Sequence, residues 1–182
     1  MADEKPSLLA GRNTAPLSEE QIRRAINTFL GLDRNVNVRY LPASQTVFRV
    51  SVDADGHEYG EIVFGPDLYP GPNIIDPNSA LSLEAAAAHE LTHYYRWKDM
   101  AALPDDAFHH LDEALTSLQA ICRYDRELNG TDKRQLVADA MQRLQLFVAE
   151  QKKPATESNV ADSAGAAQEL TGSVSAWKGL GM

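Results

Sequence analysis

Residues 82–98 read SLEAAAAHELTHYYRWK, and this stretch decides how the rest of the chain is interpreted. The run of alanines favours a helix, and in a helix residues four positions apart lie on the same face. His89 and His93 can therefore present ring nitrogens to the same metal ion. Two neutral imidazoles suit zinc, and the carboxylate of Glu90 beside them can accept a proton from a metal-bound water. The stretch thus predicts a helix that carries hydrolytic metal chemistry.

The same helix should bury the side opposite its histidines. An apolar stripe repeats along it at helical spacing, which is typical of a face packed against a core. The histidine face then remains available for a cleft. Asn78, Ser79 or Ser82 can cap the start of the helix by accepting a hydrogen bond from a backbone amide. The apolar stripe consists of Leu83, Ala87, Leu91 and Tyr94.

A second helix is predicted from about residue 105 to residue 128, after a break at Pro104. Catalytic zinc usually has three protein ligands and leaves a fourth position for water, so this helix should supply the third ligand. Glu113 is the preferred candidate, because Ser117 and Ala120 follow it at helical spacing and are small. The opposite side should be buried by an apolar stripe of Leu111, Leu115, Leu118 and Cys122.

The spacing of these residues resembles that of a known family. HELTH at 89–93 is followed, twenty positions after its second histidine, by the glutamate of DEALTS at 112–117. This arrangement is similar to that of the thermolysin-like gluzincin metallopeptidases, and the resemblance covers residues 82–128. It implies a minimal single-domain form of that family, with one zinc ion per chain and a peptide or protein as the substrate.

The resemblance also assigns roles to individual residues. It implies that His89, His93 and Glu113 bind the zinc ion. It further implies that Glu90 is the general base that takes a proton from the bound water. The family commonly places an aspartate four residues after the glutamate ligand, where it supports a zinc-bound histidine. This chain has Ser117 at that position, and a serine is the weaker hydrogen-bond acceptor.

A second departure from the family concerns the oxyanion. Thermolysin-like enzymes use a later histidine to stabilise it, and no histidine follows His110 here. Another donor is then needed for the developing negative charge. Asp112 and the two histidines one turn before Glu113 also remain open as alternative ligands or acids. The candidates for all these supporting roles are Ser117, Asp112, His109, His110, Tyr94, Tyr95, Arg123 and Tyr124.

Two other functions are compatible with the sequence. A binding or regulatory module could hold zinc for folding alone, with His109 or His110 closing the site as a fourth ligand. A degenerate protease fold could instead act as an interaction protein without catalysis. An open coordination position would favour the enzyme over the structural zinc site.

Length and composition indicate one soluble domain, with 182 residues of which 43% are hydrophobic and 24% charged. The net charge of −9 argues against nucleic acids and anionic membranes as partners, since both attract clustered cations.

No apolar run reaches the ~18 residues of a membrane helix, and the first residues carry no apolar signal core. We expect a cytoplasmic location, with secretion by a signal-less route left open. The single cysteine, Cys122, is expected to be buried as a small apolar residue.

The N-terminal part of the chain predicts a small sheet. Residues 1–17 should be a flexible lead-in, and a capping box at residues 18–21 should start a short helix that ends near Gly31. The aspartates at 53–56 are interpreted as a hairpin turn rather than as part of a calcium loop. An edge strand of the sheet could bind an extended peptide. Alternation with a period of two predicts the strands at 36–40, 48–52 and 57–64.

The remaining segments complete an α+β fold. Residues 18–152 are expected to form one zincin-like domain, in which a small N-terminal β-sheet is followed by a helical core. A loop at 65–78, with a brief edge strand at 73–76, should lead into the histidine helix. A last helix at 131–152 should pack behind the Glu113 helix, opposite the metal. Residues 153–182 should be mostly disordered, although an apolar set in them could dock on a protein partner. This set is Leu170, Val174, Trp177 and Leu180.

Overall fold

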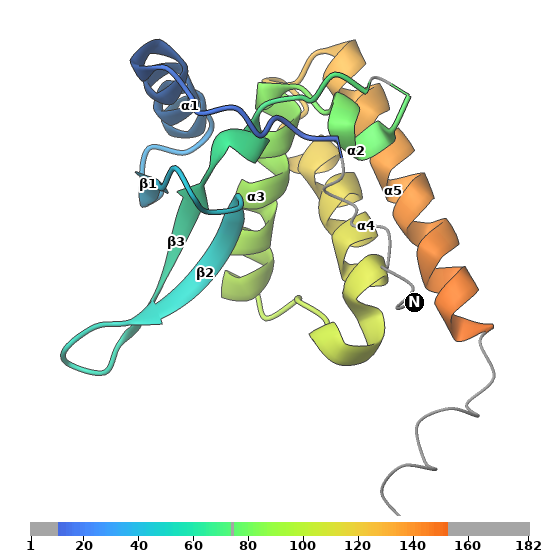
Figure 1. Cartoon of the computed structure of the whole chain (residues 1–182). Helices are drawn as coiled ribbons and strands as arrows, with labels where there is room; N and C mark the ends of the chain where they lie inside the picture. Colours follow the sequence, from blue (N-terminus) through green and yellow to red (C-terminus); the bar gives the residue numbers. More distant parts are fainter. Residues whose placement is uncertain (1–10, 74, 153–182) are drawn as a thin grey trace, which may run out of the picture. The chain divides into compact units, whose positions relative to one another are not determined.

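The computed structural model describes residues 11–73 and 75–152, and the compact unit discussed here ends at Val148 (Figure 1). A small sheet comes first and long helices follow, which confirms the predicted α+β class. The predicted tail at 153–182, with Trp177, lies outside the described residues. The elements are α1 (Glu19–Leu32), β1 (Val38–Tyr40), β2 (Val47–Val52), β3 (Glu58–Phe64), η1 (Pro66–Leu68), α2 (Pro77–Ala80), α3 (Leu83–Lys98), α4 (Asp105–Arg123) and α5 (Gly130–Gln151).

None of the helices in the described ranges combines the length and the apolar character needed to cross a bilayer.

The first helix, α1, begins at the predicted capping box. The backbone amide of Gln21 donates to the Ser18 hydroxyl over 3.3 Å, and the Ser18 amide donates to the Gln21 side chain over 2.9 Å. Ala25 and Phe29 are fully buried on its inner face. The helix therefore belongs to the scaffold, as its amphipathic pattern predicts.

Residues 11–17, which we expected to belong to a flexible lead-in, pack against the fold instead. Arg12 is only 5% exposed and Leu17 is also buried. Gly11 has a φ of +113°, a conformation that favours glycine. Gly71 lies so close to it that an added Cβ would stand 1.2 Å from the Gly11 carbonyl oxygen. Two glycines thus let this segment run directly against the loop before α2.

The three strands form one mixed sheet with the order β1-β3-β2. β2 and β3 are antiparallel, with Val47 opposite Val63, whereas β1 is parallel to β3, with Val38 opposite Ile62. This agrees with the three predicted strands and leaves β2 as an edge strand. At the hairpin turn the Asp53 carboxylate accepts hydrogen bonds from the amides of residues 55 and 57, each over 2.9 Å. The turn is therefore held by its own aspartate.

The loop between β3 and α3 contains two short helical turns, η1 and α2. The brief strand predicted at 73–76 is wrong for the residues that the structure describes there, since residues 75 and 76 form a bend. The physical reason is a helix start. Asp76 caps α2 by accepting a hydrogen bond from the Asn78 amide over 3.0 Å, and Pro77 occupies the first helical position, where its missing N–H is no loss.

Helix α3 is the central element, because it lies between the sheet and α4 (Figure 1). Ser82 caps its start, as one of the three predicted alternatives, by accepting from the Ala85 amide over 3.0 Å. The predicted stripe is confirmed for Leu83, Ala87 and Leu91, all of them buried. The helix is also buried on the histidine side, since its alanines allow neighbouring elements to approach closely. The site therefore forms inside the fold rather than on its surface.

The predicted apolar stripe of α4 is wrong as its buried face. Leu118 is 38% exposed, and Cys122 is exposed although we expected it to be buried. The buried residues of α4 are small, namely Ala114, Thr116, Ser117 and Ala120. Small side chains let two helix backbones approach each other, so α4 packs on α3 through this face and leaves its larger residues nearer to solvent.

The position predicted for the last helix is also wrong. We expected α5 behind α4 and opposite the metal, but its buried face reaches the site residues themselves. Asp139 accepts from the Ser117 hydroxyl over 2.7 Å, and Arg143 pairs with Glu113 over 2.7 Å. The buried stripe of α5 mixes apolar and charged residues, because Leu136 and Ala140 alternate with charged neighbours that find partners on α4.

The cap of α3 provides a test of this fold. The Ser82 hydroxyl accepts from the Ala85 amide and donates to the Asp132 carboxylate over 2.7 Å, so it joins the start of α3 to α5. Replacing Ser82 with alanine should lower the free energy of unfolding by about 1–2 kcal/mol, measured by urea denaturation. Ser18→Ala removes the exposed cap of α1 and should cost less. An equal or smaller loss for Ser82→Ala would contradict the joining role.

Candidate metal centre

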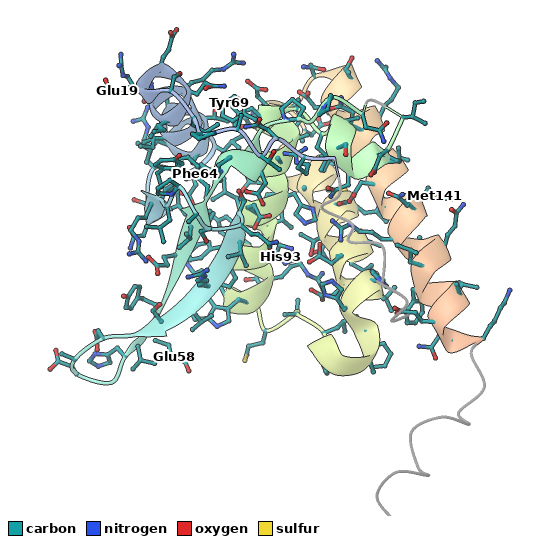
Figure 2. The ribbon with its side chains drawn as sticks, viewed as in Figure 1. Glu19, Glu58, Phe64, Tyr69, His93 and Met141 are labelled. Atoms are coloured by element: carbon teal, nitrogen blue, oxygen red, sulfur yellow. The ribbon has the colours of Figure 1, made fainter. Side chains whose placement is uncertain are left out.

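Three of the predicted ligands converge between α3 and α4. His89 and His93 lie one turn apart on α3, and Figure 2 shows His93 on the side of that helix that faces α4. Glu113 projects from α4 toward both rings. Its two carboxylate oxygens lie 3.3 Å from His89 Nε2 and 3.1 Å from His93 Nε2. The two Nε2 atoms are themselves 3.1 Å apart. The sequence prediction of these three residues as one cluster is therefore matched by the geometry.

The spacing of the three ligand atoms fits a small tetrahedral ion. Ligands at about 2.0–2.1 Å from a tetrahedral zinc lie roughly 3.3–3.4 Å from one another. The two histidine nitrogens are 3.1 Å apart, and each lies 3.1 or 3.3 Å from one of the two Glu113 oxygens, which is close to this value. Two imidazole nitrogens and a carboxylate oxygen are also a donor set that zinc accepts. Among the described residues His109 does not join this cluster, so three ligands leave a fourth position open.

The tautomer of His89 is fixed by a chain of hydrogen bonds. Ser117 donates its single hydroxyl proton to Asp139 Oδ2 over 2.7 Å. The serine oxygen must then act as the acceptor toward His89 Nδ1, which lies 2.9 Å away. With the proton on Nδ1, the lone pair of Nε2 points to the cluster and can bind a metal. Ser117, which stands where the resembled family has an aspartate, thus links the Asp139 carboxylate to the His89 ring through hydrogen bonds.

Arg143 closes this chain into a ring. Its Nε donates to Asp139 Oδ2 over 2.8 Å, and its Nη1 lies 2.7 Å from Glu113 Oε2. The ring runs from His89 through Ser117, Asp139 and Arg143 to Glu113 and back to His89. Asp139 is fully buried and Arg143 nearly so, which strengthens each of these charged contacts. Two of the three ligands are therefore held by α5 as well as by their own helices.

The charges of the cluster shift the pKa values of its members. Burial raises the pKa of Glu113, but its contacts with His89 and His93 and the charge of Arg143 outweigh that rise, so the net pKa lies well below the ordinary value. Burial lowers the pKa of His93, yet the hydrogen bond to Glu113 and its charge raise the net value. Glu113 is thus an anion at neutral pH, as a metal ligand must be.

Glu90 differs from the other carboxylates of the site. Burial raises its pKa, and the nearby histidines only partly offset that rise. Among the described residues nothing donates a hydrogen bond to its carboxylate, although it lines the same cavity as the ligands. A carboxylate with an elevated pKa and an available oxygen is suited to accept and release a proton. This placement is compatible with the predicted general base.

The cluster opens into a cavity of about 460 Å³. One wall is the beginning of β2, with Thr46, Val47 and Phe48. Asp67 fixes this wall, because its carboxylate accepts hydrogen bonds from the Thr46 amide over 2.9 Å and from the Thr46 hydroxyl over 2.7 Å. β2 pairs only with β3 among the described strands, so its other edge is available beside the cluster. An extended peptide could add to it through main-chain hydrogen bonds.

Only two of the further candidates on α4 reach this cavity. His109 and Asp112 line it, whereas His110 does not. Asp112 is already engaged, since Arg96 pairs with it and the Leu103 amide donates to it over 2.7 Å. Its role is to hold the connection between α3 and α4, which argues against a catalytic use.

The aromatic candidates lie elsewhere. The ring of Tyr94 packs against Phe48 and Trp97. Tyr95 donates its hydroxyl to Asp33 over 2.6 Å, and that hydrogen bond, with burial, raises its pKa to about 12. Tyr124 is 4% exposed in the core, and Arg123 stacks on the Tyr95 ring at 3.9 Å. The structure brings none of these side chains to the cluster.

Sequence reasoning missed Asp139, Arg143 and Arg12 as parts of the site. Asp139 and Arg143 left a weak signal, because they lie four positions apart within the buried stripe of the last helix. A charged pair in such a stripe indicates a buried partner on another element. Arg12 left no pattern in the sequence, since it lies in a short polar segment before the first helix.

The chain was compared with models of protein families, with curated proteins and with solved structures, and none of them gives a match.

The ring of hydrogen bonds makes a prediction about metal affinity. In Asp139→Asn the amide no longer carries the charge that holds Ser117 and Arg143, so both ligands beside them should lose their fixed orientation. We expect the affinity for zinc, measured by competition with a chromogenic chelator, to fall about 10–100-fold. Asp132→Asn is the matched control, because it changes a buried aspartate of the same helix that contacts Ser82 instead. Equal affinities in the two variants would exclude the supporting role of Asp139.

Proposed function

We propose that this protein is a zinc-dependent metallopeptidase that hydrolyses peptide bonds. The observation that carries the proposal is the convergence of His89, His93 and Glu113 with separations that suit a tetrahedral ion. The resemblance to the thermolysin-like gluzincins rests on the same residues and their spacing. Together they support one zinc ion per chain, bound through three protein ligands.

The residues around the cluster support hydrolysis rather than a purely structural zinc. A structural site usually has four protein ligands, whereas the described residues supply three. The open side of the cluster faces the cavity, and Glu90 lines that cavity. A zinc ion bound there would lower the pKa of a water ligand and polarise the scissile carbonyl.

In the proposed reaction Glu90 accepts a proton from the attacking water and then delivers it to the leaving amine. Its raised pKa favours the first transfer, because a carboxylate with a higher pKa is the better proton acceptor. The substrate would lie extended along the edge of β2, with its scissile bond between that strand and α3. The side chains of Val47 and Phe48 then contribute apolar contacts beside the polar chemistry. A peptide or protein substrate in the cytoplasm is the corresponding expectation.

Glu90→Gln tests the general base. Glutamine has nearly the same shape but cannot take the water proton, so the variant should bind zinc as the unchanged chain does and lose at least about 100-fold in turnover. Turnover is measured as the release of new amino groups from a mixed peptide library. Glu84→Gln provides the matched control on the same helix, because Glu84 pairs with Arg24 away from the cavity. Undiminished turnover in Glu90→Gln would remove this residue from the base role.

Glu113→Gln and Glu113→Ala test the third ligand. Both variants remove the negative charge that binds the metal, and we expect zinc affinity to fall by about 100-fold or more, since a protein ligand is lost. The glutamine variant preserves the volume beside Arg143 and controls for a packing defect. Calorimetric titration with zinc gives both affinity and stoichiometry. Unchanged affinity in both variants would transfer the ligand role to His109 or Asp112, which line the same cavity.

A further inference from the structure

Arg12 stands out among the buried charges of the protein. Three arginines are buried in the described residues, namely Arg12, Arg96 and Arg143. Arg96 is paired with a carboxylate of α4, and Arg143 is paired with Glu113 and Asp139. Arg12 has no such pair, since no described carboxylate oxygen lies within ion-pair distance of its guanidinium. It is nevertheless only 5% exposed and lines the cavity beside the metal cluster.

The guanidinium of Arg12 is held by backbone carbonyl groups. Nε donates to the carbonyl of Asp67 over 2.7 Å, and Nη2 donates to that of Leu68 over 2.6 Å. Nη1 donates to the carbonyls of Asn78 and Leu81, each over 2.9 Å. An arginine has five N–H donors, so the second hydrogen of Nη2 is the one left over from these bonds. The group is thus fixed in position before any ligand arrives.

This arrangement leaves the guanidinium without a directly bonded carboxylate. Carbonyl dipoles satisfy its hydrogen bonds but do not neutralise the cation, and a buried charge without a paired partner is destabilising. Burial lowers the pKa of Arg12 to about 10, although the charges of nearby carboxylates, Asp67 and Glu90 first among them, act in the opposite direction. A preorganised cation in a cavity is a ready site for an anion, since it needs no further ordering when the anion binds.

We propose that Arg12 binds a carboxylate of the substrate, either the α-carboxylate at a peptide C-terminus or the side chain of an acidic residue. The proposal rests on the proposed peptidase function for the peptide nature of the ligand. Arg12 and Glu90 line one cavity of about 460 Å³. Because Arg12 lines the same cavity as the proposed base, the carboxylate would lie near the scissile bond. The substrate class is therefore a peptide with a carboxylate close to the cleaved bond.

The proposal can be tested by binding in the absence of turnover. The full chain with Glu90→Gln is labelled with ¹⁵N-arginine, and the Nε–H signal of Arg12 is followed by NMR. The probes are four mixtures of acetylated tetrapeptides built from Ala, Leu, Phe and Gln. The first ends in a free carboxylate and the second in a carboxamide. The third and fourth also end in a carboxamide, and carry one Glu or one Gln at a fixed position, respectively.

We expect the first or the third mixture to shift the Arg12 signal and to bind about tenfold or more tightly than its neutral counterpart, as a charge-assisted hydrogen bond implies. The first identifies a C-terminal carboxylate and the third an acidic side chain. Equal affinities within both pairs, or no binding by any mixture, would overturn the proposal. The titrations are repeated with and without zinc, because zinc itself attracts carboxylates. A shift of the Arg12 signal that persists without zinc must come from binding at Arg12.

Arg12→Lys provides the genetic test, since lysine retains the charge but not the planar fork that the carbonyl groups hold. It should remove the preference for the carboxylate probes, whereas Arg24→Lys, on the exposed face of α1, should not. If Arg12→Lys does not fold, the Arg12 Nε–H signal of the Glu90→Gln chain still tests the proposal. The two proposals fail separately. Carboxylate-dependent binding without hydrolysis by the chain that retains Glu90 would refute the peptidase alone, and hydrolysis without carboxylate preference would refute the role of Arg12 alone.

Discussion

The close approach of α3 and α4 is the constraint on which the rest of the structure depends. Alanines at 85–88 on α3 and small residues on α4 let the two helices meet through their least bulky faces. Only then can Glu113, on one helix, reach His89 and His93, on the other, within 3.3 Å. Larger residues at this contact would separate the helices and disperse the ligands. Leu118 is exposed because α4 packs on α3 through its small residues and not through its leucines.

Burial of this contact also requires that its charges be compensated. Glu113 is partly buried beside the cavity and Asp139 is fully buried, and Arg143 lies between the two carboxylates. A buried ion pair is rarely a source of stability, because removing both charges from water offsets most of their attraction. Its effect here is orientation, since Ser117 relays the position of Asp139 to His89. The helix α5 must consequently lie on the metal side of α4, where its charged stripe finds these partners.

The sequence alone was sufficient for features that depend on short spacing. The two histidines and their neighbouring glutamate lie on one regular helix, so helical periodicity was enough to bring them together, whereas Glu113 also needed the spacing that resembles a known family. Periodicity could not show which face of α4 packs, because small residues leave no apolar signal while Cys122 and its leucines do. The ring through Asp139 and Arg143 joins residues that are far apart in the chain. Arg12 was out of reach for the same reason, since its carbonyl partners come from two distant segments, 67–68 and 78–81.

The two histidines are not equivalent, and the difference indicates how a metal would be presented. His89 is 4% exposed, and Ser117 fixes its ring from the interior. His93 lies nearer to the cavity, and its Nδ1 is 3.5 Å from the hydroxyl of Thr116, at the limit of a hydrogen bond. Protein ligands therefore surround the cluster from the core side, where their orientation is rigid. The opposite side opens into the cavity lined by Glu90 and the beginning of β2, so the position without a protein ligand would face this cavity.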